Sequence, residues 1–234
     1  TGSGGRIAVH YDPIAQSSHP LPGLTISAGT RPSDTSRVLD LSNNSRIGTV
    51  VVPDYRFLTS PIRHSGDWRA TAAPSTLAFD VLTVTNVWLR IDQAGLQLHV
   101  TNGLEVHRGG RMEWTNAAVT CGSFLLNDFG VLDTYGGTFA VGGSAALADD
   151  SYLRVRAAPT NGLPYGALVE IGGTLDISDN TWIYPVSHPT NGGSVKVACG
   201  NAVIGAGAGF DANSAGFRND TGKKGYGPGA GIGW

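Results

Sequence analysis

The sequence predicts an all-β solenoid, in which short strands stack coil upon coil along one axis. The first observation is a motif that returns five times: an alternating apolar pair, two small residues forming a turn, and a second alternating strand. Its equivalent positions are Val100, Val119, Val141, Ile171 and Val197, which are spaced by 19, 22, 30 and 26 residues. Spacings in this range are typical of stacked repeats. The second observation is that apolar and polar residues alternate along most of the chain, with almost no helical periodicity.

The alternating segments give the expected strands, which are separated by Asn-Gly, Gly-Gly, Asp-Asp and Pro-containing turns. They cover residues 6–11, 24–26, 38–41, 49–52, 79–84, 87–91, 96–106, 118–125, 140–144, 170–177 and 196–203. We expect one β-helical domain over residues 1–234, with irregular early coils to residue 75, regular coils over 76–210 and a glycine-rich tail over 211–234.

Two inserts interrupt the repeat with the same four residues. Pro-Thr-Asn-Gly occurs at 159–162 and again at 189–192, each time before a returning strand. Inserts of this kind project from one face of a solenoid and often form its binding surface. A turn that has simply become longer is the plainer interpretation.

Composition excludes several classes of function. Charged residues make up 15% of the chain and the net charge is −2, so there is no basic surface for nucleic acid. No run of 18 apolar residues occurs, so we expect no membrane span. The chain begins inside a glycine-rich phrase without a signal peptide, which predicts processing from a larger precursor.

The two cysteines, Cys121 and Cys199, occupy the same position of the repeat three coils apart. Strands stack about 4.8 Å apart, which places the two residues roughly 14 Å from each other. A disulfide needs Cα atoms within about 7 Å. We therefore expect two unpaired cysteines that serve as small core residues.

Both ends of the chain resemble a known family. The segment GSGGRIAVHY at 2–11 and the segment GYGPGAG at 225–231 are similar to the GSGGRIAVxY and GYGPGxG phrases of very large, glycine-rich bacterial surface proteins. Those proteins carry coils resembling residues 79–106 between such phrases. The resemblance implies a right-handed parallel β-helix and an extracellular structural or adhesive role. The long glycine-rich runs of the family are cut short here.

Catalysis is not expected. Many β-helix enzymes act on polysaccharides through paired carboxylates, and the candidates here are Asp128, Asp133, Asp149, Asp150, Asp176 and Asp179. All lie at or beside turns, and no Lys or Arg is placed with them for charge neutralisation. Arg154 and Arg156 alternate on one strand face and could bind an acidic sugar, although an exposed strand explains them equally well.

Metal and sugar sites have plainer alternatives. The six histidines do not form a zinc-binding pattern. Asp149, Asp150 and Asp211 could supply oxygen ligands to calcium, but carboxylates also stabilise turns. No other cofactor is expected. Trp68, Trp88, Trp114 and Trp182 are expected to pack in the core or at coil edges, a sugar-stacking platform being the alternative.

Neither end carries the polar cap that solenoids usually have. Trp234 closes a glycine-rich tail and needs another surface to pack on. We therefore expect copies to join head to tail, in a heterologous contact that propagates. The expected interface residues are Arg6, Ile7, Val9, Tyr11, Tyr226, Ile232 and Trp234. The predicted function is a structural subunit or module of an extracellular fibre, with polysaccharide as a candidate partner besides other copies of the chain. The alternatives are a carbohydrate-active enzyme and a polysaccharide-binding adhesin.

Overall fold

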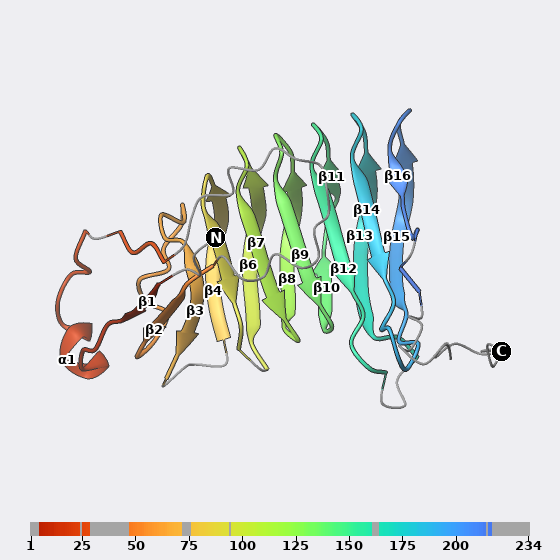
Figure 1. The fold of residues 1–234 in the computed structure, drawn as a ribbon. Coiled ribbons are helices and arrows are strands. Elements are labelled where there is room, and N and C mark those ends of the chain that lie inside the picture. Colours follow the sequence, from red (N-terminus) through yellow and green to blue (C-terminus); the bar gives the residue numbers. More distant parts are fainter. Residues whose placement is uncertain are drawn as a thin grey trace.

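In the computed structural model, the chain forms two all-parallel β-sheets, and successive strands alternate between them (Figure 1). The structure describes residues 5–23, 25–28, 47–71, 76–93, 95–160, 164–213 and 215–216. Each strand pairs with the strand one coil earlier and one coil later, which is the arrangement of a parallel β-helix. The predicted fold class is therefore confirmed.

The first sheet contains nine strands. They are β1 (Arg6–Ala8), β2 (Thr49–Val52), β3 (Gly66–Ala70), β5 (Trp88–Ile91), β7 (Arg111–Thr115), β9 (Val131–Tyr135), β12 (Tyr152–Arg156), β14 (Trp182–Val186) and β16 (Gly209–Phe210). The second sheet contains β4 (Thr76–Thr85), β6 (Gln97–His107), β8 (Ala118–Leu126), β10 (Thr138–Val141), β11 (Ala145–Leu147), β13 (Ala167–Ile177) and β15 (Val195–Ile204). Strands β10 and β11 share one level, because both pair with β8 and with β13. A short helix, α1 (Pro13–Ser17), follows β1.

The predicted register of the repeat is wrong by two residues in two coils. The ladder that contains Val100, Val141 and Ile171 also contains Cys121 and Cys199. The predicted members Val119 and Val197 lie two residues earlier in their strands. A shift of two residues leaves every side chain on the same face of the strand, so apolar alternation alone does not detect it. The buried face is correct, and Val119 is completely buried.

In four of the five repeats the pair of small residues is a bend inside a long strand and not a turn, and in the repeat at Val141 it lies between β10 and β11. Strands β6, β8, β13 and β15 continue through it, and the register shifts there between neighbouring strands. Coils approach closely at this bend. A Cβ atom on Gly172 would lie 2.4 Å from the carbonyl oxygen of Gly142, and one on Gly122 would lie 2.5 Å from that of Asn102. Side chains are therefore excluded from these positions by backbone contact.

The apolar interior lies between the two sheets. Trp68 and Trp114 are fully buried there, as predicted. Trp88 and Trp182 instead stand at one edge of the outer face of the first sheet, where Trp88 is buried and Trp182 is half-buried. The outer positions alternate with the core positions along each strand, as expected for a sheet with one buried face.

The N-terminal end of the solenoid is covered, contrary to the prediction that neither end has a cap. Tyr55, Phe57, Leu58 and Ile62 are buried in the core, and Ile62 bridges Val84 of β4. The cap comes from loops between β2 and β3, whose irregular sequence has no repeat to reveal it. Residues 161–162 of the first Pro-Thr-Asn-Gly insert lie outside the described residues. The segments that follow the two inserts meet one coil apart, where the backbone N–H of Gly166 donates to the carbonyl of Ser194 at 2.8 Å.

Candidate functional site

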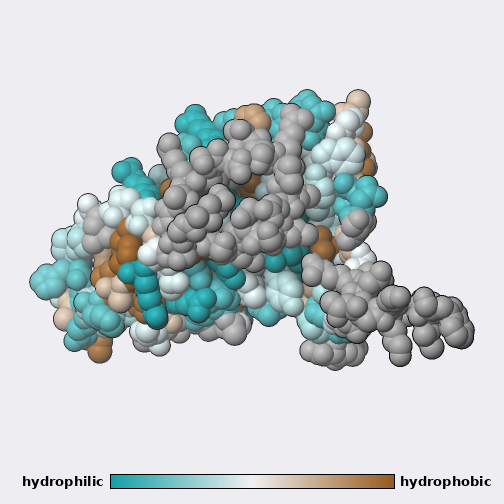
Figure 2. Space-filling model, in the orientation of Figure 1, coloured by the Kyte–Doolittle hydropathy of each residue, from teal (hydrophilic) through white to brown (hydrophobic). Residues whose placement is uncertain are grey.

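The apolar interior is open at the C-terminal end of the described chain. Ile204 aligns with Ile177 of the preceding coil, and Phe210 aligns with Ile183. The two preceding residues are completely buried, whereas Ile204 is 48% and Phe210 is 43% exposed. Cys199 also points to the interior and is exposed. Figure 2 shows apolar surface at this end of the molecule.

The last strands also have unpaired edges in the described chain. Strand β15 pairs with β13, and β16 pairs with β14, each on one side. The other side of each strand presents backbone N–H and C=O groups, which are a template for a further strand. The open interior and the unpaired edges together make this end a contact surface.

The cysteines are unpaired, as predicted. They occupy one ladder position three coils apart, through Val141 and Ile171. Cys121 is a core residue, and burial raises the pKa of its thiol to about 12. The prediction of a core position is wrong for Cys199, because no described residue covers the last coil there.

A groove of about 820 Å³ lies at the N-terminal end, between α1, the loop after β2 and the first half of β4. Leu21, Leu58, Leu77 and Phe79 give it apolar walls, and Ser17 lies on its polar side. Sequence reasoning missed this groove, because its walls come from segments without repeat periodicity.

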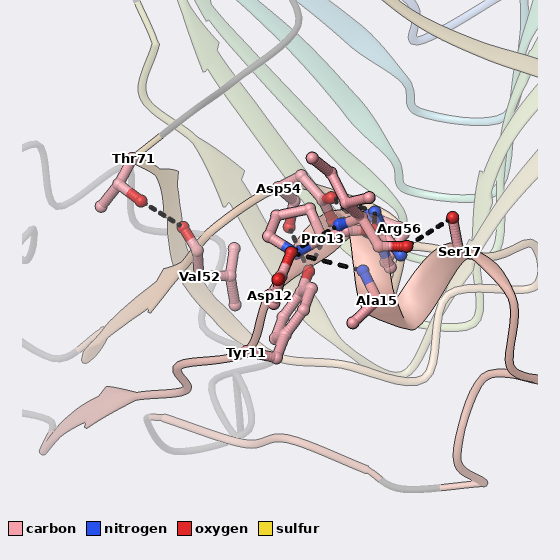
Figure 3. A network of polar contacts seen from close by, with 10 residues as sticks. Tyr11, Asp12, Pro13, Ala15, Ser17, Val52, Asp54, Arg56 and Thr71 are labelled. Atoms are coloured by element: carbon pink, nitrogen blue, oxygen red, sulfur yellow. Dashed lines mark hydrogen bonds and ion pairs between the residues drawn. The ribbon is translucent and has the colours of Figure 1, made fainter.

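The groove is held in shape by a network around Asp54 (Figure 3). The hydroxyl of Tyr11 donates to Oδ1 of Asp54 at 2.5 Å, and Nε of Arg56 donates to Oδ2 at 2.9 Å. Arg56 also donates to the carbonyl of Pro13 at 2.8 Å, and Asp12 caps α1 through the backbone N–H of Ile14. Helix α1 is therefore fixed to the loop after β2.

This network also affects two ionisable groups. Burial, together with the hydrogen bond to Asp54, raises the pKa of Tyr11 to about 12. Burial alone would raise the pKa of Asp54, but hydrogen bonds from Arg56 and Tyr11 outweigh it and hold that pKa below its usual value. At neutral pH the network therefore contains a neutral phenol and a charged carboxylate.

The predicted interface residues of the N-terminal segment lie against their own chain to different degrees. Ile7, Val9 and Tyr11 are partly buried and pack on the core, and the Tyr11 ring meets Phe57 edge-on at 5.3 Å. Arg6 is exposed on β1, whose outer edge is unpaired in the described chain. The other predicted interface residues, Tyr226, Ile232 and Trp234, lie outside the described residues.

Half of the β4 edge is free among the described residues. Ile62 donates its backbone N–H to the carbonyl of Thr83 at 2.8 Å, and Thr83 donates to Oγ of Ser60 at 3.1 Å. These bonds cover the second half of β4. The first half, Thr76–Phe79, pairs with β6 on one side and faces the groove on the other.

A ladder of charged residues crosses the outer face of the first sheet. Its members align in register on five neighbouring strands: Asp67, Arg90, Glu113, Asp133 and Arg154. The carboxylate of Asp133 is completely buried. It accepts hydrogen bonds from Nε of Arg154 and from Nε of Arg156, both at 3.0 Å, and Nη2 of Arg111 lies 3.6 Å away.

The expectation that no cation is placed with the candidate carboxylates is therefore wrong for Asp133. Sequence reasoning also missed Glu113, which is buried and accepts a 2.7 Å hydrogen bond from the Trp88 indole. The signal was present, because the charged positions of the ladder recur every 20 to 23 residues. Arg154 and Arg156 are both committed to Asp133, so neither is a free cation.

The remaining carboxylates have conformational roles or lie on the surface. Asp128, Asp149, Asp150 and Asp179 lie in the turns that lead from the second sheet to the first, all with left-handed backbone, a conformation that Asp tolerates well. These turns stack, and Phe129 donates its backbone N–H to the carbonyl of Asp149 at 3.1 Å.

The other two candidate carboxylates lie elsewhere in the fold. Asp176 is exposed on β13, and Asp211 accepts the backbone N–H of Asn213 at 2.9 Å just after β16. In the described residues, no group of three or more His, Cys, Asp or Glu side chains could hold a metal ion. Calcium binding by Asp149, Asp150 and Asp211 stays a prediction.

The fold and the two ends of the described chain define a parallel β-solenoid, with one end covered and the other open among the described residues. No protein-family model matches the chain, and comparisons with curated proteins and with solved structures give no match. None of the described helices is long and apolar enough to cross a membrane.

Proposed function

We propose that this chain is a structural β-solenoid that associates end to end, as a subunit or module of an extracellular or cell-surface fibre. The observation that carries the proposal is the open last coil. Ile204 and Phe210 are about half exposed at positions that are completely buried one coil earlier. Covering each of them would contribute roughly 1 kcal/mol, since full burial of such side chains is worth about 1.5–3 kcal/mol.

The two ends favour a head-to-tail contact. Among the described residues, the C-terminal end offers the unpaired edges of β15 and β16, and the N-terminal end offers the edge of β1 and the free half of β4. The two surfaces differ, so the contact between them is heterologous and repeats from copy to copy. Each copy would thereby add its strands to the sheets of the next.

The extracellular location rests on the resemblance of the two end phrases to bacterial surface proteins. Contact of such a fibre with polysaccharide belongs to the same proposal. A carbohydrate-active enzyme should present clustered carboxylates and a basic residue in a cleft. Glu113 and Asp133 are such neighbours, but both are buried and ion-paired. This favours a structural role over catalysis.

The test compares two neighbouring residues of β15. Ile204→Lys places a charge at the open interior, and Val203→Lys places the same charge on the outer face of the same strand. The two side chains are equally exposed, at 48% and 49%. We expect the unmodified chain and the Val203 variant to form rods that lengthen with protein concentration, and the Ile204 variant to stay monomeric. Electron microscopy and sedimentation velocity measure both.

Two outcomes would overturn the proposal. One is a monodisperse monomer of the unmodified chain at every concentration. The other is an equal loss of association in both variants, because a general effect of added charge would then explain it. Circular dichroism of each variant establishes that it is folded.

A further inference from the structure

We propose that residues 225–234 of one copy bind as an extended strand in the N-terminal groove of a second copy. The groove is the 820 Å³ space between α1 and the first half of β4. This inference rests on the proposed end-to-end association and names the contact that would join two copies.

The groove has the features of a site for strand addition. One wall is the free edge of β4 over Thr76–Phe79, which offers backbone groups for pairing. Leu21, Leu58 and Leu77 supply apolar surface beside it. Main-chain hydrogen bonds give affinity in this binding mode, and pockets for alternate side chains give specificity.

Only a short segment fits. The second half of β4 is already covered, because Ile62 donates to the carbonyl of Thr83 at 2.8 Å. A ten-residue strand such as β15 cannot pair with β4 over its whole length, because half of it would meet that cover. The occupant is therefore an extended segment whose pairing spans about four residues of β4.

The tail of this chain has the matching pattern. Every second residue from Gly225 to Gly233 is glycine, and the residues between them are Tyr226, Pro228, Ala230, Ile232 and Trp234. In a strand, successive side chains point to opposite faces. One face of this strand would therefore carry no side chains and the other would carry mainly apolar ones. This pattern matches a groove that has apolar walls on one side only. Pro228 has no N–H and suits an edge position.

The distance favours a second copy over the chain's own groove. Helix α1 and strand β16 lie at opposite ends of the solenoid (Figure 1). From β15 to a strand placed beside β4 there are six strand spacings, or about 29 Å along the axis. Residues 217–224 span at most roughly 29 Å when fully stretched. For residue 225 to reach the chain's own groove, the residues before it would have no length left to pass around the molecule, whereas in a head-to-tail contact the next groove is adjacent.

The first experiment uses a fluorescently labelled peptide of residues 221–234 and the full chain at a concentration where it is monomeric. Leu21→Glu places a charge on the groove wall, and Ile14→Glu is its matched control. Both side chains are exposed, and Ile14 lies on α1 outside the groove. We expect the Leu21 variant to bind the peptide about tenfold more weakly and the Ile14 variant to stay within about twofold. A peptide with Ile232→Ser and Trp234→Ser should lose binding.

The second experiment distinguishes copies. A photo-cross-linking residue in place of Trp234 is introduced into a mixture of ¹⁵N-labelled and unlabelled chains. We expect cross-links that join labelled to unlabelled chains at residues 17–21 or 77–79. Cross-links within single chains only, or at other residues, would overturn the inference.

The inference and the proposed function fail separately. If the Leu21 variant and a chain lacking residues 225–234 still form rods, the tail does not join the copies, and the association through the open coil stands alone. If the Ile204→Lys variant is monomeric yet binds the peptide normally, the open coil and the groove are two separate contacts, and both proposals hold.

Discussion

Arg154 and Asp133 are register partners on adjacent strands, and Nε of Arg154 donates to the buried carboxylate of Asp133 at 3.0 Å. Burial alone would lower the pKa of Arg154, but its hydrogen bonds to Asp133 outweigh this effect and raise it. Arg154 therefore stays charged although its side chain is 95% buried, and the side chain of Asp133 is completely buried. A buried pair of this kind depends on both of its members.

We predict that Asp133→Asn strongly destabilises the fold. The substitution leaves Arg154 buried without its ion-pair partner, which typically costs about 3–5 kcal/mol. Asp92→Asn is the control, because Asp92 also contacts arginines but is 32% exposed, and exposed pairs contribute roughly 0–1 kcal/mol. Urea denaturation monitored by circular dichroism measures both. Equal losses of unfolding free energy in the two variants would show that the buried ion pairs contribute no more to stability than the exposed ones.

A second prediction concerns the glycine bend of the second sheet. Gly172→Ala should cost about 1–3 kcal/mol, because its new Cβ would lie 2.4 Å from the carbonyl oxygen of Gly142, which belongs to the backbone. Gly142→Ala should be almost neutral, since its nearest neighbour is 3.7 Å away. The two glycines occupy corresponding positions in neighbouring coils, each one residue after a register partner of the other coil, so thermal denaturation compares them directly. A larger loss for the Gly142 variant would contradict the close-approach explanation.

These glycines also show how far the sequence could predict the fold. Alternation identified the long strands of the second sheet and their buried faces, because it depends only on which side chains are apolar, but it did not single out β7, β9 and β14 of the first sheet. It did not fix the register at Val119 and Val197, since a shift of two residues keeps the same face buried. It also mistook the bend at Gly172 for a turn, because small residues are typical of both and only the stacked neighbour distinguishes them.

The sequence predicted the C-terminal end of the solenoid better than the N-terminal end. The cap formed by Tyr55 and Phe57 has no repeat, so periodicity does not reveal it. The last described coil is open because the strand-turn-strand repeat ends near Ile204, and the end of the repeat can be read from the sequence. The charged ladder at Glu113 and Asp133 could have been predicted by applying the repeat spacing to outward positions as well as to inward ones.

A third prediction concerns pH. Nδ1 of His64 accepts the backbone N–H of Ile26 at 3.0 Å, and Nε2 lies 2.8 Å from the carbonyl of Phe57, so the buried ring is neutral. Burial lowers the pKa of His64, against a smaller opposing effect of the hydrogen bond to Phe57. The unfolded chain therefore binds this proton more readily, and stability should fall as the pH decreases from about 6.5 toward the lower folded pKa.

The substitution His64→Gln separates this effect from those of other groups. The variant should be less stable than the unmodified chain at pH 8, because it loses the ring that joins Ile26 and Phe57. The difference in the free energy of unfolding should become smaller at pH 5, where the protonation penalty affects only the chain with the histidine. A difference that stays constant between these pH values would contradict the assignment.

The final prediction uses the two cysteines to probe the open end. Cys199 is exposed and should react quickly with a thiol reagent, whereas Cys121 should react only after unfolding, because burial raises its thiol pKa to about 12 and the thiolate is the reactive form. Native protein should therefore give one fast-reacting thiol per chain, and denatured protein two.

Cys199 aligns with Ile171 and faces the interior of the last coil, so a partner covering that coil must also cover its thiol. The rate at Cys199 should fall as the protein concentration rises, and it should stay constant in the Ile204→Lys variant. A rate independent of concentration in rods visible by electron microscopy would place their contact away from the last coil.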